Sequence, residues 1–188
     1  MHHSASADGP ARNILTDYLA SRQLELSIEQ ITKVLNFCAL ILRWNRLTSL
    51  VQASTLEQLV ESHVIDCLSA VDEITGPNVA DIGSGAGFPG IVFAVAKPQW
   101  HFNLIETNQR RARFLTQAQI DLSLPNVTVI NSRVEDWQGG KQINCITSRA
   151  YSALADFFAS CKHLLASEDS PDTHFVALKG RLEAQELA

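Results

Sequence analysis

Residues Asp81–Gly90 (DIGSGAGFPG) combine a carboxylate with four glycines in ten positions. Glycine has no Cβ atom, so it permits positive φ angles and lets a ligand approach the backbone closely. An apolar run precedes this segment and a helical pattern follows it, with Pro89 suited to the first turn of that helix. The start of a helix offers free amides and about half a positive charge. The segment therefore predicts a strand, turn and helix that bind a nucleotide-like cofactor.

Two classes of cofactor bind at such a turn. Gly85, Gly87 and Gly90 match the dinucleotide pattern G-x-G-x-x-G, which would make the chain an NAD-dependent oxidoreductase. Asp81 favours S-adenosylmethionine, because a carboxylate at a strand end would repel a pyrophosphate but can orient the amino-acid end of the methyl donor. Gly83 then follows the strand directly, and Gly83, Gly85 and Gly87 wrap the donor. We favour the methyl donor and keep the dinucleotide as the alternative.

Further candidates for the cofactor site follow the next two apolar runs. Glu106 ends the second run, where its carboxylate can accept both ribose hydroxyls of an adenosine, a role shared by the two cofactor classes. The alternative for Glu106 is an ion pair with Arg110 at helical spacing. Val134 and Glu135 follow the third run, where the adenine ring is expected; their alternative is an ordinary surface turn.

Charged residues at later strand ends and on one helix are candidates for substrate contacts. Arg149 ends the fourth apolar run, where it could pair with the carboxylate of the donor or with a substrate phosphate. Lys179 ends the fifth run in the same way. His63 and Asp66 lie one helical turn apart and could line the substrate side of the pocket; equally, Asp66 could hold His63 in a packed helix interface.

The elements that must position these residues alternate between strands and helices from residue 77 to residue 188. Short apolar runs predict strands over residues 79–82, 102–105, 127–130, 143–147 and 175–178. The helical segments 88–98, 108–123 and 152–166 are long enough for crossovers between parallel strands. Only a short helical turn fits between residues 131 and 142. This alternation predicts an α/β fold, a Rossmann-like doubly wound parallel sheet.

Residues 1–76 are helical in pattern and predict an N-terminal extension of three helices packed on the sheet. Two capping boxes are expected, Ser27 with Gln30 and Ser54 with Glu57. The second helix has a broad apolar face that needs a partner to bury it. Its members are Ile28, Ile31, Leu35, Phe37, Ala39, Leu42, Trp44 and Leu47.

The composition excludes several classes of protein. Apolar residues make up 46% and charged residues 19% of the chain, which is typical of a globular protein and not of a disordered one. The net charge of −5 argues against a surface that coats nucleic acid, but it leaves room for a local basic patch. No run is long enough to span a membrane, and a cytoplasmic monomer is expected. The cysteines, expected as buried thiols without a metal site, are Cys38, Cys67, Cys145 and Cys161.

Over nearly its whole length the chain resembles the glucose-inhibited division protein B family, the bacterial small-subunit ribosomal RNA guanine-N7 methyltransferases. The segments that carry the resemblance are Trp44–Ser49, His63–Asp66, Asp81–Gly90, Arg110–Leu115, Ser132–Glu135, Ser148–Ala150 and Ala177–Gly180. The resemblance implies donor contacts at Gly83, Phe88, Val134, Glu135 and Arg149. It also implies that the substrate is a guanosine in the decoding region of the small-subunit RNA.

For the RNA, we expect arginines to contact phosphates and an aromatic side chain to stack on the extruded guanine. The arginines are Arg110, Arg111 and Arg133, and the aromatic is Tyr151 or Phe88. Core packing is the alternative for both aromatics, and a solvated surface is the alternative for the arginines. A non-catalytic ribosome-binding module with the same fold is a further alternative for the whole chain.

The expected chemistry needs positioning more than proton transfer. Guanine N7 carries an available lone pair at neutral pH, so no general base is required, and positioning can lower the barrier by on the order of 7 to 11 kcal/mol. Ser148–Tyr151 (SRAY) replaces the Asn-Pro-Pro-aromatic motif of amino-group methylases. The family's sheet is similar to that of seven-stranded relatives, whereas this chain ends at Ala188. The last strands are therefore expected to be missing.

Overall fold

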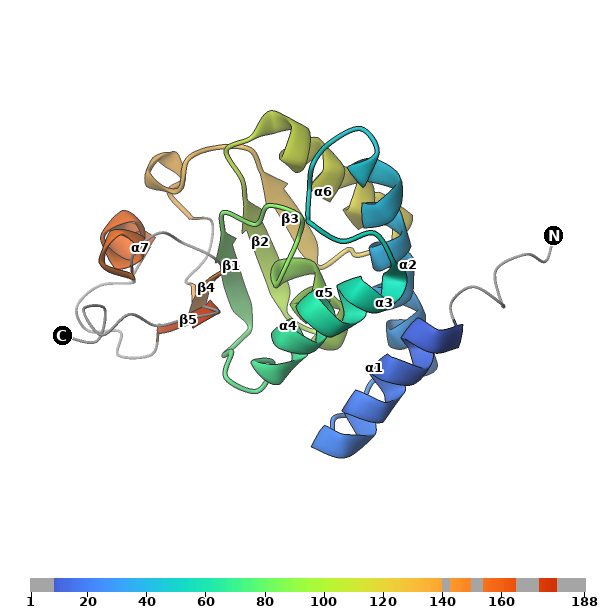
Figure 1. The fold of residues 1–188 in the computed structure, drawn as a ribbon. Coiled ribbons are helices and arrows are strands. Elements are labelled where there is room, and N and C mark those ends of the chain that lie inside the picture. Colours follow the sequence, from blue (N-terminus) through green and yellow to red (C-terminus); the bar gives the residue numbers. More distant parts are fainter. Residues whose placement is uncertain (1–8, 140–142, 150–153, 165–172, 179–188) are drawn as a thin grey trace.

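The computed structural model describes residues 9–139, 143–149, 154–164 and 173–178, which form a five-stranded parallel sheet with helices on both sides (Figure 1). The strands are β1 Asn78–Ile82, β2 His101–Ile105, β3 Val127–Ile130, β4 Cys145–Arg149 and β5 His174–Leu178. Their order is β3-β2-β1-β4-β5. The five strands that the apolar runs predict are therefore confirmed, within two residues at each end, as is the doubly wound parallel sheet.

The path of the chain reverses beside β1. From β1 it passes through α5 (Gly90–Ala96) to β2 and through α6 (Gln109–Asp121) to β3. It then crosses back, by way of the short turn η2 (Val134–Asp136), to β4 on the other side of β1, and α7 (Leu154–Cys161) and η3 (Lys162–Leu164) precede β5. Ligands of such sheets bind at the carboxyl ends of the strands, next to the point of reversal. The fold thus predicts a site at the ends of β1, β2 and β4.

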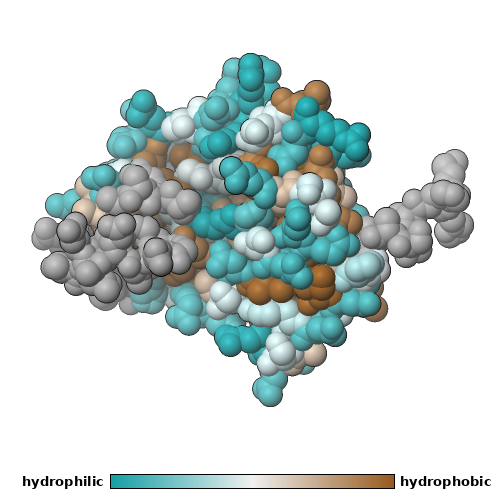
Figure 2. Space-filling model, in the orientation of Figure 1, coloured by the Kyte–Doolittle hydropathy of each residue, from teal (hydrophilic) through white to brown (hydrophobic). Residues whose placement is uncertain are grey.

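Each face of the sheet has its own hydrophobic cluster, because side chains alternate along a strand. Val79 and Phe102 face a large cluster that also contains the N-terminal helices, α5 and α6. Ala80 and Ile146 face a smaller cluster that contains Phe157 of α7. Polar side chains cover much of the described surface visible in Figure 2. None of the helices that the structure describes combines the length and the hydropathy of a membrane-spanning helix.

The N-terminal part contains α1 (Gly9–Arg22), α2 (Ile28–Asn45) and a third, composite helix. The composite helix runs through α3 (Leu56–Leu59), the π-helical segment η1 (Val60–Val64) and α4 (Ile65–Ser69). The capping box of Ser27 and Gln30 is confirmed at the start of α2.

The second predicted capping box is wrong by one residue. Thr55, not Ser54, caps α3 by accepting the backbone N–H of Gln58 at 3.2 Å. The side chain of Gln58 in turn accepts the backbone N–H of Ser54 at 2.9 Å. A full capping box does not form here, because Gln58 accepts the N–H of Ser54 and not that of the cap residue Thr55. Glu57 has no part in the cap.

The buried face of α2 is rotated relative to the predicted one. Ile28 is 81% exposed and Leu47, just beyond the helix, is 87% exposed, so neither belongs to the core. Val34, Cys38 and Ile41 are buried instead, because α2 packs against α1, α5 and α6 together. The buried residues common to the prediction and the structure are Ile31, Leu35 and Phe37. All four cysteines of the chain are buried free thiols, as expected.

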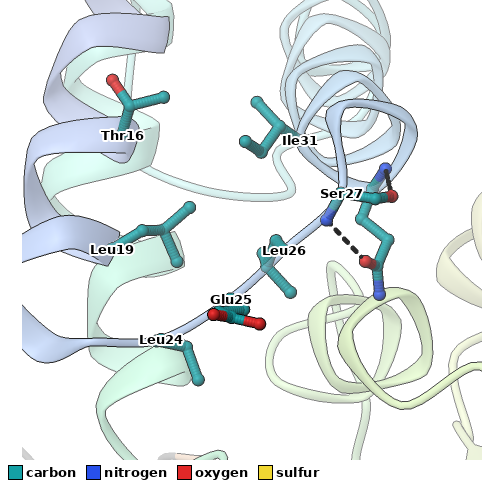
Figure 3. A pocket seen from close by; sticks show the side chains of 8 residues that line it. Thr16, Leu19, Leu24, Glu25, Leu26, Ser27 and Ile31 are labelled. Atoms are coloured by element: carbon teal, nitrogen blue, oxygen red, sulfur yellow. Dashed lines mark hydrogen bonds between the residues drawn. The ribbon is translucent and has the colours of Figure 1, made fainter.

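A cavity of about 650 Å³ lies between α1 and α2 (Figure 3). Leu19 and Ile31 line it from the two helices, and the capping box of Ser27 and Gln30 borders it. The amide of Gln30 also donates to the backbone carbonyl of Val95 at 2.8 Å. This bond ties the start of α2 to the end of α5, far from the carboxyl ends of the strands.

Candidate active site

The glycine-rich turn folds back over the end of β2. Gly83, Gly85 and Gly87 have φ angles of 68°, 56° and 90°, which L side chains rarely adopt. The N–H of Gly83 donates to the carbonyl of Ile105 at 2.8 Å. A Cβ atom on Gly83 would meet nothing within 4 Å, so the turn is open to a ligand at this residue. A Cβ on Gly87 would lie 2.8 Å from the side chain of Ile91, so Gly87 faces the core.

Gly90 also serves packing and not ligand access. A Cβ atom there would overlap the side chain of Leu104 and lie 2.6 Å from Asp81 Oδ2. In dinucleotide sites the second glycine of the G-x-G-x-x-G pattern lets the pyrophosphate approach. The second glycine of the register that starts at Gly85 is Gly87, which faces the core. The glycine that is open to a ligand is Gly83, which lies before the dinucleotide register. Gly83 belongs to the glycine register that is expected for a methyl donor.

Asp81 is fully buried beneath the turn. Its Oδ2 accepts the backbone N–H of Gly90 at 3.2 Å, while Oδ1 has no hydrogen-bond partner in the described part of the chain. Burial raises the pKa of Asp81 to about 7, although the side chain of Ser84, the Gly90 amide and the charge of Arg149 oppose this shift. Near neutral pH the carboxyl group can therefore gain or lose a proton when a charged ligand arrives.

Glu106 binds the turn to the start of α6. It is 4% exposed, and its two carboxylate oxygens accept the backbone N–H groups of Gly85 at 2.8 Å and Asn108 at 2.7 Å. The alternative ion pair with Arg110 does not form among the described residues, because the carboxylate is turned towards the glycine turn and Arg110 points into solvent. Glu106 thus lies beside the turn, as the prediction of a ribose contact requires.

Arg149 connects the end of β4 to the π-helical segment. Its Nη2 donates to Nδ1 of His63 at 2.6 Å, and its Nη1 lies 3.9 Å from Oδ2 of Asp66. The guanidinium group also lies 5.2 Å from the ring centroid of Phe88, which is itself 5.1 Å from the ring of His63. Asp66 therefore contacts Arg149, and the structure gives it no hydrogen bond to His63. Phe88 is buried, and it supports this cluster from the glycine-rich segment.

The π-helical segment places His63 for this contact. A π turn inserts an extra residue into the helix and rotates the side chains that follow, and such turns are frequent at functional sites. Because Nδ1 of His63 accepts the Arg149 bond, the proton of the neutral ring is on Nε2. Burial and the charge of Arg149 lower the pKa of His63. Nη1 of Arg149 is buried and has no hydrogen-bond partner among the described residues.

The residues expected around the adenine lie in η2. Val134 is 5% exposed and packs in the same cluster as Ile82 and Ile105, which end β1 and β2. Glu135 and Arg133 are exposed. The turn therefore presents one apolar and two charged side chains close to the strand ends.

The remaining predicted RNA contacts are spread over the surface or lie outside the described residues. Arg110 and Arg111 are exposed in the first turn of α6. Tyr151 and Lys179 lie outside the described residues. The structure thus brings Arg149 and Phe88 into contact with His63, and Arg149 close to Asp66, and it leaves Arg110 and Arg111 on the outside.

Two asparagines that support the site were missed by the sequence analysis. Asn108 caps α6 by accepting the N–H groups of Arg110 and Arg111 at 2.9 and 3.2 Å. Asn131, after β3, donates to the carbonyls of Glu106 and Thr107 at 2.7 and 3.1 Å. An asparagine just before a helical run is a recognisable capping signal, whereas nothing in the sequence indicates the contact of Asn131.

A parallel sheet of this order, with an open glycine turn after β1 and a buried carboxylate after β2, is a Rossmann-like fold of the kind found in class I methyltransferases. A crystal structure from Staphylococcus aureus, provisionally described as a caffeoyl-CoA O-methyltransferase, has this fold. Its TM-score to this chain is 0.51 at 17% identity, over 82% of this chain and 68% of that one.

The chain belongs to the rRNA small subunit methyltransferase G family, whose model matches residues 30–188. The ribosomal RNA small subunit methyltransferase G of Nitrosospira multiformis is 40% identical over 177 residues, which are 93% of this chain and 82% of the relative. The protein of the same name from Nitrosomonas europaea is 38% identical over 156 residues, 83% of this chain and 72% of the relative. The family resemblance carried by the sequence motifs is thereby confirmed.

Proposed function

We propose that this chain is an S-adenosylmethionine-dependent methyltransferase that modifies N7 of a guanosine in the RNA of the small ribosomal subunit. Membership of the rRNA small subunit methyltransferase G family supports the reaction and the class of substrate. One observation carries the choice of donor. Asp81 Oδ1 and Arg149 Nη1 are buried atoms of an acidic and a basic side chain, and neither has a hydrogen-bond partner among the described residues, since Asp66 Oδ2 lies 3.9 Å from Nη1.

The amino-acid end of S-adenosylmethionine fits these two atoms. An ammonium group would give Asp81 Oδ1 a donor, and a carboxylate would give Arg149 Nη1 an acceptor. The pyrophosphate of a dinucleotide carries only negative charge and would satisfy Arg149 alone. Both atoms are closed to solvent in this structure, so the side chain of Arg149 has to shift to admit this end of the donor.

The other parts of the donor have partners along the strand ends. We assign the open face of the turn, Gly83 with Gly85, to close approach of the donor, and Glu106 to its ribose hydroxyls. Gly87 supports the turn from the core side. Val134, with Glu135 beside it, would pack against the adenine. Phe88 is assigned a supporting role, because it lies under the guanidinium group of Arg149.

The bound donor would supply an electrophilic methyl group on its sulfonium. The chain's own residues then have to align guanine N7 with that methyl group and exclude water, and such positioning is worth on the order of 7 to 11 kcal/mol. No proton has to be removed from N7. His63 suits this scheme, because its Nδ1 is engaged by Arg149 and its pKa is lowered, so it stays neutral. His63 and Asp66 are assigned to the substrate side of the pocket.

The surface around the site suits a phosphate backbone. Arg110, Arg111 and Arg133 are exposed, and within the described ranges none of them has a salt bridge. We propose that they contact RNA phosphates, where arginine's forked donors are well matched. Tyr151 and Lys179 are proposed as a stacking and a phosphate contact respectively.

We further propose a cytoplasmic monomer with two parts, a helical extension over residues 1–76 and a donor-binding part over residues 77–188. The large hydrophobic cluster runs through both parts, which supports their action as one unit. The large exposed apolar residues that the structure describes are few and scattered, which favours a monomer. They are Ile28, Leu47, Ile120 and Phe158.

Transfer of a labelled methyl group tests the proposal directly. The protein should transfer label from S-adenosylmethionine to small ribosomal subunits from cells that lack this activity. Nucleoside mass spectrometry of the RNA should identify 7-methylguanosine. Arg149→Ala should abolish incorporation, and Arg22→Ala, on the exposed surface of α1, should not. If the unaltered protein transfers no label, the proposal fails, and the alternative of a non-catalytic ribosome-binding module replaces it.

A thermal-shift measurement separates the two cofactor classes. A ligand that binds only the folded state raises the melting temperature. S-adenosylmethionine should raise it and NAD should not. The reverse result would favour the alternative of an NAD-dependent oxidoreductase, which the G-x-G-x-x-G register permits.

A further inference from the structure

A second cavity, of about 430 Å³, lies between α2, α6 and the edge strand β3, outside the donor site. Its volume falls within the range of small-ligand pockets. One aromatic ring, one guanidinium group and several side-chain amides converge on it. The lining residues are Trp44, Gln109, Ala112, Arg113, Thr116, Gln117, Val129 and Asn131.

Trp44 provides a ring that is held in place by the core. Its indole packs edge-on against Phe114 of α6, with 5.4 Å between ring centroids and an interplanar angle of 67°. Phe114 is fully buried, whereas Trp44 is half-buried and lines the cavity. A ring fixed in this way can stack on a nucleobase, a contact that tolerates any base because every base has a π face.

The charge around the cavity suits a phosphate. Residues 43–46 and 109–117 together contain five arginines and no carboxylate, although the whole chain has a net charge of −5. Arg43 lies 3.7 Å from Asp121, but among the described residues Arg113 has no ion pair or hydrogen bond for its side chain. This local excess of positive charge favours an anionic partner such as RNA over a cationic or apolar one.

The amides at the rim can meet the polar edge of a base. Asn131 uses its Nδ2 for the carbonyls of Glu106 and Thr107, which leaves its Oδ1 without a partner in the described part of the chain. Gln109 has no side-chain partner there either. Because Asn131 also holds the backbone of Glu106, the cavity adjoins the end of β2 that carries the donor site. An RNA strand that passes Arg110 could therefore reach both the cavity and the donor site.

We propose that this cavity binds an unpaired nucleotide of the RNA substrate other than the target guanosine. Its base stacks on Trp44, its polar edge meets Gln109 or Asn131, and its phosphate meets Arg113. The proposal rests on RNA being the substrate, as put forward above. It adds a second point of attachment that would help select which guanosine reaches the donor.

Single-stranded RNA binding by the full chain tests the cavity without any need for methyl transfer. The probe is a fluorescein-labelled ten-nucleotide RNA, and affinity is read from its anisotropy. Trp44→Leu keeps apolar packing against Phe114 but removes the stacking face, and it should weaken binding roughly 5- to 100-fold. Trp44→Phe should retain most of the affinity. Arg113→Ala should weaken binding and reduce the salt dependence by about one phosphate contact, whereas Arg22→Ala should do neither.

Intrinsic fluorescence adds a local signal. RNA should quench tryptophan emission of the unaltered protein, and Trp44→Phe, which leaves Trp100 and Trp137 in place, should lose most of that quenching. RNA affinity that is unchanged in a folded Trp44→Leu protein, or quenching as large in Trp44→Phe as in the unaltered protein, would overturn the proposal. Melting temperatures establish that each variant is folded.

Two further measurements separate this proposal from the proposed function. In methylation assays the Trp44→Leu and Arg113→Ala proteins should show a raised KM for small subunits and an unchanged Kd for S-adenosylmethionine. If the unaltered protein transfers no methyl group, the proposed function fails, and the anisotropy measurement still tests whether the cavity binds RNA. If it transfers methyl groups and Trp44→Leu binds RNA normally, only the cavity proposal fails.

Discussion

Replacing Asp81 by asparagine should change how the stability of this protein depends on pH. The carboxyl group is fully buried, and burial raises its pKa from 3.8 to about 7. Between these two values the folded state holds a proton that the unfolded chain has released. The stabilisation from this proton is therefore fully present below pH 3.8 and is lost as the pH rises through about 7.

The size of the effect follows from the two pKa values. One pKa unit corresponds to about 1.4 kcal/mol, so the shift amounts to about 4 kcal/mol over the whole range. Between pH 6 and pH 8 the expected loss in the free energy of unfolding is about 1 kcal/mol. Asparagine keeps an oxygen that can accept the N–H of Gly90, 3.2 Å from Asp81 Oδ2, but it does not titrate. Above pH 7 the variant should be at least as stable as the unaltered protein.

Urea unfolding of both proteins at pH 6, 7 and 8 measures this difference. Other groups, His63 among them, titrate in both proteins, so the difference between the two curves isolates Asp81. If the difference in the free energy of unfolding between the two proteins stays constant from pH 6 to pH 8, the raised pKa of Asp81 is refuted. The m-values of the two proteins should agree, because the substitution does not change the surface exposed on unfolding.

The same carboxyl group links donor binding to proton release. An ammonium group beside Asp81 would favour its ionised form and lower its pKa. Binding of S-adenosylmethionine at pH 7 should therefore release protons, which calorimetry in buffers of different ionisation enthalpy detects. Asp81→Asn should bind more weakly and release none from this site. Donor binding without proton release by the unaltered protein would show that the ammonium does not meet Asp81.

Four further substitutions test other parts of the structure. His63→Gln keeps an acceptor for Arg149 and should remove the loss of stability that sets in as pH falls below 6.5, because the pKa of His63 is lowered on folding; urea unfolding at pH 5 and 7 measures it. Gly83→Ala should cost about 1 to 2 kcal/mol for its φ of 68° and should weaken donor binding in calorimetry. Glu106→Gln should lose one of two backbone contacts, with a cost of about 1 to 3 kcal/mol in unfolding and weaker donor binding. Phe37→Ala should cost about 3 to 5 kcal/mol in urea unfolding, because it empties a fully buried site, and it should also weaken donor binding, because Phe37 packs against Phe88 with 5.1 Å between ring centroids.

Local patterns in the sequence predicted the elements well where one residue type or one period decides the structure. The five strands, the capping box of Ser27 and Gln30 and the glycine turn are of this kind. The predictions were wrong where two adjacent residues could each cap a helix, or where contacts with other helices decide which residues are buried. Thr55 displaced Ser54 as the cap, and Ile28 is exposed because the packing of α2 against several other helices, α1, α5 and α6 among them, sets its buried face.

The sequence by itself determined the type of fold, the position of the glycine turn and the presence of acidic and basic groups at strand ends, because these depend on neighbours along the chain. Only the tertiary structure decided how those groups meet. The contact of Arg149 with His63, 86 residues apart, and the bond of Glu106 to Gly85 join separate elements. The raised pKa of Asp81 is likewise a consequence of burial. Long-range packing sets such distances and the removal of water, and no local pattern encodes either.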